Sequence, residues 1–153
     1  MDLPGYVQLD GHRSQAVRVS VGAWHTCAIA QGGPLRCWGF GPDGQLGTGG
    51  RTNYHSPSHL VGDVQVDGLG SRAVEVAASS YHTCAILEGG RVRCWGKGTE
   101  GQLGTGNLEN VLNPSNLAGD VQLNERGSRA IQVTAGEYHS CALLEGGDMR
   151  CWG

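Results

Sequence analysis

Apolar and polar residues alternate along short segments of this chain, and glycine-rich stretches separate one segment from the next. The segment AVEVAAS, from Ala73 to Ser79, places Val74 and Val76 on one face. The segments HTCAIL (residues 82–87) and RVRCWG (residues 91–96) follow, with a glycine turn between them. Alternation with period two is typical of strands, and no stretch combines a helical period with the capping residues of a helix. The pattern therefore predicts an all-β chain of antiparallel strands.

The same segments recur along the chain at a fixed period. Cys27, Cys84 and Cys141 are 57 residues apart, and the neighbouring histidines, second cysteines and tryptophans keep that spacing without insertion or deletion. The segment GQLGTG occurs at residues 44–49 and again at 101–106. Self-similarity at a fixed period indicates an array of one supersecondary unit, stacked against its neighbours.

Each repeat is predicted to contain four strands. The fourth lies near SHLVGDVQV, residues 58–66, after the long loop that contains GQLGTG. Residues 1–153 then form one repeat domain: an orphan fourth strand at 3–9, a first unit at about 16–66, a second at about 73–123 and a partial third at about 130–153.

The hairpin between the second and third strands can be placed in register from its apolar residues. A three-residue turn, residues 88–90, pairs Ile86 with Val92 and Cys84 with Cys94, whereas a slip of one residue would separate the apolar side chains. Cysteines directly opposite each other on antiparallel strands come close enough for a disulfide. This register predicts three bridges, each within one repeat: Cys27–Cys37, Cys84–Cys94 and Cys141–Cys151.

Two other interpretations of the cysteines stay open from the sequence. Free thiols fit the same inward positions, because cysteine is a small and well-buried side chain. A zinc site would need four ligands, and His82, Cys84 and Cys94 offer three. If the disulfides form, they favour an extracellular or other oxidising compartment; otherwise the sequence leaves the localisation unknown.

Composition and charge argue against several classes of protein. The 27 glycines recur at fixed repeat positions, which is typical of ordered turns and not of low complexity. A net charge of −3 without a basic stripe gives no reason to expect nucleic acid. No apolar run approaches the roughly 20 residues that a membrane span needs, and MDLPGYVQLDG lacks the regions of a signal peptide.

Catalytic chemistry is not indicated. Asp43, Glu88, Glu100 and Asp148 lie in or beside predicted turns, and none forms a pair suited to acid–base catalysis. No nucleophile elbow, phosphate loop or zinc-protease helix occurs in the sequence. We therefore expect no enzyme activity, no metal and no cofactor.

The order of motifs within a repeat resembles that of the regulator-of-chromosome-condensation repeat family. The family pattern A-G-x-x-H-T-C-A-L, then G-x-V-x-C-W-G, then G-Q-L-G-x-G, stands here as SSYHTCAI (79–86), GRVRCWG (90–96) and GQLGTG (101–106). The third repeat, AGEYH at 135–139, follows it most closely, whereas Ser79 replaces the family's glycine in the second. The paired cysteines are more similar to those of bacterial members than to the eukaryotic founder.

The resemblance implies a β-propeller of four-stranded antiparallel blades around a central axis. It also implies a binding function, since members of the family bind proteins, among them a bacterial inhibitor of β-lactamases. The founder promotes nucleotide exchange on a small GTPase through special insertions, which the uniform repeats of this chain lack. We expect a protein partner, whose identity the sequence does not give.

A ring of aromatic residues is the first candidate site. Trp24, Tyr81 and Tyr138 stand directly before the repeated histidine, in the turn that joins the first two strands. In a propeller these turns lie on one rim, and aromatic side chains dominate binding hot spots. The alternative is that each ring packs on the next blade.

Further candidates flank the aromatic positions. In the β-lactamase inhibitor the two positions before this histidine belong to the binding face. The resemblance therefore adds the residues that precede the aromatic ones, namely Ala23, Ser80 and Glu137. The long loop after the third strand contributes two less specific candidates, Arg51 and Tyr54.

The strand count predicts an assembly. The chain holds three blades' worth of strands, which is too few to close a ring, since propellers have roughly four to eight blades. We expect a homo-oligomer, and favour a dimer in which Tyr6–Leu9 of one chain pairs with Asp148–Cys151 of the other in a six-bladed ring. The alternative is a piece of a longer propeller. The alternative function is accordingly a structural or self-assembling fragment, completed by strand exchange and without other partners.

Overall fold

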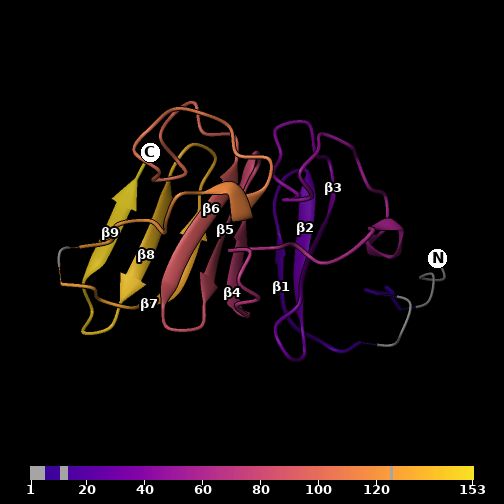
Figure 1. Cartoon of the computed structure of the whole chain (residues 1–153), viewed down its shortest axis with the longest axis horizontal. Coiled ribbons are helices and arrows are strands. Elements are labelled where there is room, and N and C mark those ends of the chain that lie inside the picture. Colours follow the sequence, from indigo (N-terminus) through magenta and orange to yellow (C-terminus); the bar gives the residue numbers. More distant parts are fainter. Residues whose placement is uncertain (1–5, 11–13, 125) are drawn as a thin grey trace.

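The computed structural model describes residues 6–10, 14–124 and 126–153. Nine strands in these residues form three sheets of three strands each. The sheets are β1 (Ala16–Val21), β2 (His25–Ala30) and β3 (Leu35–Gly39); β4 (Ala73–Ala78), β5 (His82–Leu87) and β6 (Arg91–Gly96); and β7 (Ala130–Ala135), β8 (Ser140–Leu144) and β9 (Met149–Trp152). They stand in a row in chain order, with long loops between them (Figure 1). The all-β prediction is confirmed.

The hairpin register agrees with the sequence prediction. Cys84 lies opposite Cys94, and Ile86 opposite Val92. Gly89 and Gly90 in the turn have φ values of 87° and 79°, a conformation that glycine adopts without the strain of a side chain. The first and third sheets repeat the arrangement.

All six cysteines are paired in disulfides. The S–S distances are 2.12 Å for Cys27–Cys37, 2.07 Å for Cys84–Cys94 and 2.04 Å for Cys141–Cys151. The free-thiol interpretation is therefore set aside, and the described residues contain no cluster of histidine, cysteine or acidic side chains that could hold a metal.

The predicted fourth strand is not formed among the described residues. Its first part is a short 3-10 helix, η1 (Pro57–His59), and its counterpart in the second repeat is η2 (Pro114–Asn116). Proline fixes φ and removes an N–H donor, which suits the first turn of a helix better than a sheet. The rest of the segment makes one main-chain bond to the sheet, from Val64 N to Leu35 O at 2.8 Å.

An arginine side chain holds this segment in place of a ladder of main-chain bonds. In the second repeat, the Arg93 guanidinium donates to Asp120 at 2.7 Å, to the Pro114 carbonyl at 2.9 Å and to the Val66 carbonyl at 3.4 Å. Arg36 makes the corresponding contacts in the first repeat. The segment therefore lies along the third strand without becoming part of the sheet.

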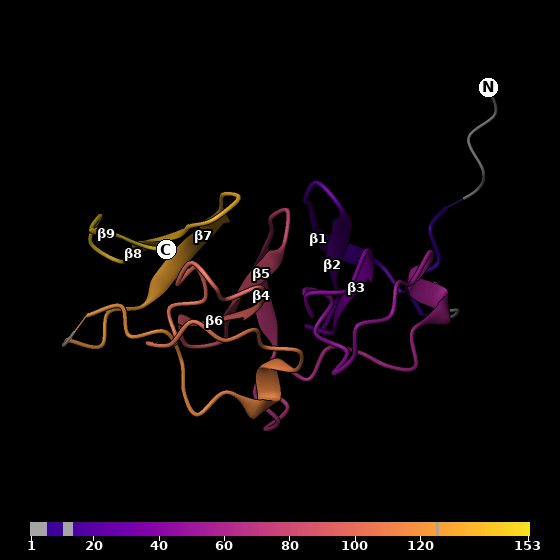
Figure 2. The same ribbon diagram turned by 90° about the horizontal axis from the view of Figure 1, so that it is seen from above.

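The start of the chain packs as such a segment. Residues 3–5 of the predicted orphan strand lie outside the described residues, and residues 6–10 are not a strand. Leu9 is buried with Ala28 and Ala30 of β2, and its carbonyl accepts from Arg36 at 2.9 Å. In Figure 2 this segment lies beyond the β1–β3 sheet, at the end of the row away from β7–β9.

The core lies between successive sheets. One cluster joins the Cys27–Cys37 face of the first sheet to Val76, Leu87 and Trp95 of the second. The other joins the Cys84–Cys94 face of the second sheet to the third. The described residues contain two helices, η1 and η2, and neither is long and apolar enough to cross a membrane.

Candidate protein-binding rim

The turns before the second strands and the loops after the third strands lie along one edge of the three sheets, the upper edge in Figure 1. Main-chain bonds join them: Phe40 N donates to Trp24 O at 2.9 Å, and Lys97 N donates to Tyr81 O at 3.0 Å. Phe40 and Lys97 follow Gly39 and Gly96, the last residues of β3 and β6. The first and second repeats thus each present two neighbouring side chains at this edge, Trp24 with Phe40 and Tyr81 with Lys97.

Aromatic rings gather there in two pairs. The ring centroids of Trp24 and Phe40 are 6.3 Å apart, and those of Tyr81 and Tyr138 are also 6.3 Å apart, with the latter pair stacked. The Lys97 ammonium lies 5.3 Å from the centroid of each tyrosine ring, within the range of a cation–π contact. Tyr81 belongs to the second repeat and Tyr138 to the third, so the contact spans two repeats.

These side chains reach solvent as well as each other. Trp24 is 57% exposed and Tyr138 44%, whereas Tyr81 is half-buried. Tyr81 and Tyr138 pack together across repeats, as the packing alternative expected, whereas Trp24 is open to solvent. We name the aromatic residues with Lys97 the aromatic rim, consisting of Trp24, Phe40, Tyr81, Lys97 and Tyr138.

The positions before the aromatic residues are also accessible. Ala23 and Glu137 are exposed and Ser80 is half-buried. A hydrogen bond to the Glu137 carboxylate, together with its negative charge, raises the pKa of the Tyr138 hydroxyl above its ordinary value of 10.

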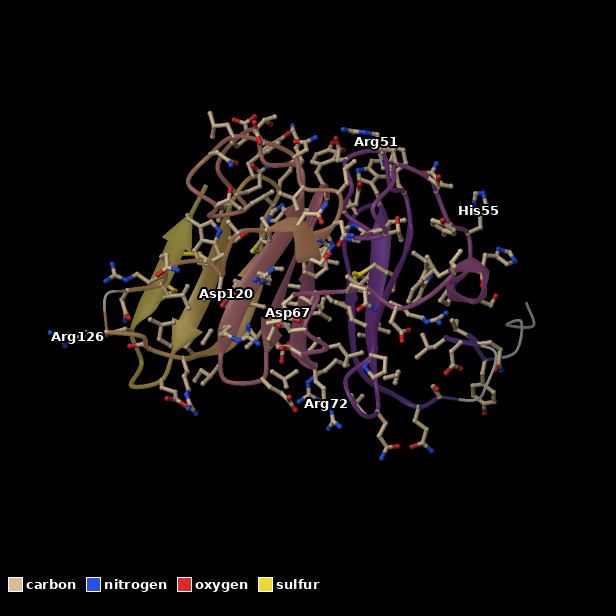
Figure 3. The ribbon with its side chains drawn as sticks, viewed as in Figure 1. Arg51, His55, Asp67, Arg72, Asp120 and Arg126 are labelled. Carbon is tan, nitrogen blue, oxygen red and sulfur yellow. A yellow bond between two sulfur atoms is a disulfide. The ribbon has the colours of Figure 1, made fainter. Side chains whose placement is uncertain are left out.

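The two loop candidates differ in their surroundings. Arg51 is exposed at the rim end of the molecule, where Figure 3 labels it, and its guanidinium donates to the Pro42 carbonyl. Tyr54 is half-buried against the core between the first two sheets, and its main chain exchanges two bonds with Gly39. Arg51 is available to a partner, whereas Tyr54 is largely engaged in packing.

Beneath the rim, buried histidines link one sheet to the next. His25 Nε2 lies 2.7 Å from Thr83 Oγ1, which donates to the Gln45 carbonyl at 2.8 Å. His82 Nε2 lies 2.7 Å from Ser140 Oγ, which donates to the Gln102 carbonyl at 2.9 Å. Each hydroxyl gives its one proton to a carbonyl, so each Nε2 must be the protonated nitrogen of a neutral ring.

Burial keeps these rings neutral. It lowers the pKa of His25 and that of His82 from 6.5 to about 4. This contact between repeats was not predicted from the sequence. The available signal was the hydroxyl residue that always follows the histidine, at positions 26, 83 and 140.

Comparison with known proteins identifies the repeat. A family model described as the regulator of chromosome condensation (RCC1) repeat matches residues 35–86 and 89–143, and a second model of the same description matches 16–45 and 73–102. The chain is 37% identical over 147 residues to the ultraviolet-B receptor UVR8 of Arabidopsis thaliana, covering 95% of this chain and 30% of that protein. It is 32% identical over 145 residues to the human E3 ubiquitin-protein ligase HERC2, covering 95% of this chain and 3% of HERC2.

Solved structures show the same fold. Human WBSCR16 matches with a TM-score of 0.80 at 22% identity, over 95% of this chain and 35% of that one. Yeast RCC1 (Prp20), solved with Kap60 bound, matches with a TM-score of 0.69 at 21% identity, over 97% of this chain and 31% of that one. The chain thus spans about a third or less of these relatives, and the likeness is one of fold.

Proposed function

Because the chain belongs to the RCC1 repeat family, we propose that it is a protein-binding β-propeller module without catalytic activity, and that its partner contacts the aromatic rim. The observation that carries the proposal is the gathering of two pairs of aromatic rings, Trp24 with Phe40 and Tyr81 with Tyr138, at the turns before the second strands. The contact surface includes the residues before the aromatic positions and the long loop, namely Ala23, Ser80, Glu137, Arg51 and the exposed edge of Tyr54.

The rim has the physical properties of a binding hot spot. Trp24 and Phe40 expose large apolar rings side by side. Rings held by neighbours lose little conformational freedom when a partner covers them, and tryptophan and tyrosine are the commonest hot-spot residues. The Lys97 ammonium contacts both of the stacked tyrosine rings.

Related structures agree with a protein partner. Yeast RCC1 was solved with Kap60 bound, and the Prp20p structure is described with binding properties to Gsp1p and histones. These are partners of those proteins. For this chain they support the class of partner and not its identity.

Alanine substitution at the rim tests the proposal. With a partner identified by crosslinking in the source organism, Trp24→Ala and Tyr138→Ala should each weaken binding in calorimetry by about 1–4 kcal/mol. Leu69→Ala is the matched control, because Leu69 is 84% exposed and lies away from the rim. Unchanged affinity in both rim variants, with unchanged melting temperature, would contradict rim binding.

Self-assembly is the second candidate function, in the form of a homodimer that closes a six-bladed ring by exchange of its N-terminal segments. What favours it is the packing of Leu9 on Ala28 and Ala30, because Val66 packs on the second sheet in the same way. By the same alignment, Val7 corresponds to Val64. The Val64 N–H donates to the Leu35 carbonyl, in the third strand of the preceding sheet. In the dimer, the Tyr6–Leu9 segment lies along Asp148–Cys151 of the other chain, joined by few main-chain bonds.

The three disulfides are compatible with an oxidising compartment. We propose an extracellular or comparable location on this ground. Recovery of the native protein with all six cysteines paired, after alkylation during cell lysis, is the expected result.

A further inference from the structure

We infer that the two outer sheets of this chain bind each other between copies: the outer face of β7–β9 in one copy receives the outer face of β1–β3 in a second copy. The inference rests on the self-assembly proposal above, adds the side chains of the interface to it, and is independent of the aromatic rim. The interface repeats, in direction and register, the contacts that successive sheets make within the chain.

The internal contacts follow one rule. The first strand of a sheet turns alternate side chains toward the disulfide of the sheet before it. Val76 of β4 is buried in one cluster with the Cys27–Cys37 bridge, and Val133 of β7 is buried in the other with the Cys84–Cys94 bridge. Both clusters are apolar and closed, so the contact is a stable way to cover each face.

The first sheet carries the same apolar side chains on an open face. Val19 is 67% exposed and Val21 is 71% exposed, whereas Val76 and Ala78, their counterparts one repeat later, are buried. Burying a valine side chain is favourable, because it removes apolar surface from water. Two adjacent exposed valines therefore favour a contact that covers them.

The third sheet carries the matching open face. Met149 is 67% exposed and Cys151 is exposed, whereas Val92 and Cys94 at the same positions of the second sheet are fully buried. The Cys141–Cys151 bridge lies where Cys84–Cys94 receives the next sheet. The valines of β1 in a second copy fit this face as the valines of later sheets fit the earlier bridges.

The histidine–hydroxyl series has a free member at each end. His139 continues the series at the third sheet, is exposed, and makes no ring hydrogen bond among the described residues. Thr26 begins the series at the first sheet, and no histidine ring bonds its hydroxyl within the described part of the chain. Stacking the two faces brings the His139 ring to Thr26 of the second copy, the contact already made twice inside each chain.

A second polar contact between the copies is also expected. Ser20 Oγ accepts from the Ala78 N–H of the next sheet at 2.9 Å. The residue equivalent to Ser20 is Ala77 in the second sheet, and alanine has no hydroxyl. In the third sheet the equivalent residue is Thr134, whose side chain is exposed. Thr134 is therefore able to accept from the Val21 N–H of a second copy.

A mixing experiment tests this arrangement in the 153-residue chain. Val21→Asp places a carboxylate on the first-sheet face, and Met149→Asp places one on the third-sheet face. Each variant alone should associate at least about tenfold more weakly than the parent in sedimentation equilibrium, because an unpaired charge would be buried. An equal mixture should recover heterodimers, because each variant keeps one intact face and the two intact faces are complementary.

Controls and contrary outcomes are defined by the same geometry. Leu69→Asp, at an exposed position off both faces, should associate like the parent. Val19→Asp is the second first-face variant, and circular dichroism checks that every variant folds. A parent that stays at 16.0 kDa at all concentrations overturns both the inference and the self-assembly proposal. If deleting residues 1–10 abolishes association while the face variants do not, strand exchange stands and the face contact is wrong.

The disulfide at the interface provides an independent readout. In the parent, reduction of Cys141–Cys151 followed by alkylation and mass spectrometry should slow several-fold as protein concentration rises, because the second copy covers the bridge. In Val21→Asp the rate should not depend on concentration. A concentration-independent rate in the parent would contradict the interface, and unchanged rim binding by Val21→Asp separates this result from the first proposed function.

Discussion

The second and third sheets have nearly the same sequence motif and differ in what covers them. Cys94 and His82 of the second sheet are fully buried, whereas Cys151 and His139 of the third are exposed. Strand order, hairpin register and disulfide are nevertheless the same in both sheets. Strand pairing and the disulfide therefore form within each unit, whereas the neighbouring unit decides how much each residue contributes to stability.

Substitution of the repeated tryptophan should give the largest difference in stability between a covered sheet and a partly uncovered one. Trp95 is fully buried between two sheets, and its Nε1 donates to the Gln45 carbonyl at 3.0 Å. Trp95→Ala should lower the free energy of unfolding by about 3–5 kcal/mol. Trp38→Ala, in the same position of the partly uncovered first sheet, should cost clearly less. Equal losses in urea denaturation would show that coverage by a preceding sheet has no influence.

Lowering the pH should reduce the stability of the fold through the buried histidines, His25 and His82, and not through the exposed His139. The unfolded chain takes up protons on His25 and His82 near pH 6.5, but the folded chain only near pH 4, where burial places their pKa values. Stability is therefore lost as pH falls from 6.5 to 4, by up to about 3 kcal/mol per histidine.

Denaturation between pH 7 and 5 measures this loss while the carboxylates remain ionised. His139→Gln, which changes the exposed ring, should leave the slope unchanged, whereas His82→Gln should reduce it. A midpoint that is constant over this pH range would exclude the histidines as the cause.

Removal of a disulfide should have an intermediate effect. Replacing Cys84 and Cys94 together by alanine should cost about 2–3 kcal/mol, because the bridge restricts the unfolded chain. Under mild reductant, the exposed Cys141–Cys151 pair should open before the two buried pairs at low protein concentration. Mass spectrometry after alkylation gives the order, and six alkylatable thiols in the untreated protein would exclude the disulfides.

A serine found in the second repeat should give the smallest change. Ser79 Oγ lies 2.8 Å from His82 Nδ1, while the first and third repeats have Gly22 and Gly136 at this position. Ser79→Gly should cost about 1 kcal/mol through the lost bond. The reverse change is blocked in the first repeat, because a side chain on Gly22 would meet the Ser79 carbonyl at 1.8 Å. A stabilised Ser79→Gly protein in thermal denaturation would contradict this assignment.

The sequence predicted the parts of the fold that depend on near neighbours. Cys84 and Cys94 are ten residues apart, and the Gly89-Gly90 turn permits a single register in which apolar residues meet. The fourth strand failed as a prediction because alternation in residues 58–66 does not reveal that Arg36 bonds the segment through its side chain. The candidate rim was inferred from the sequence at its three turn positions, but Phe40 and Lys97 were missed because their approach to the turn depends on two main-chain bonds.

The sequence alone was enough to predict the repeat, three strands of each unit, the hairpin register and which cysteines lie opposite each other, because these depend on alternation and on contacts within one unit. Only the tertiary structure decided which equivalent residues are core and which are surface. Val76 is buried and Val19 exposed at the same repeat position, since a preceding sheet covers the one and not the other. The physical reason is that burial, and with it a histidine pKa or the energy of a valine, belongs to a contact between units.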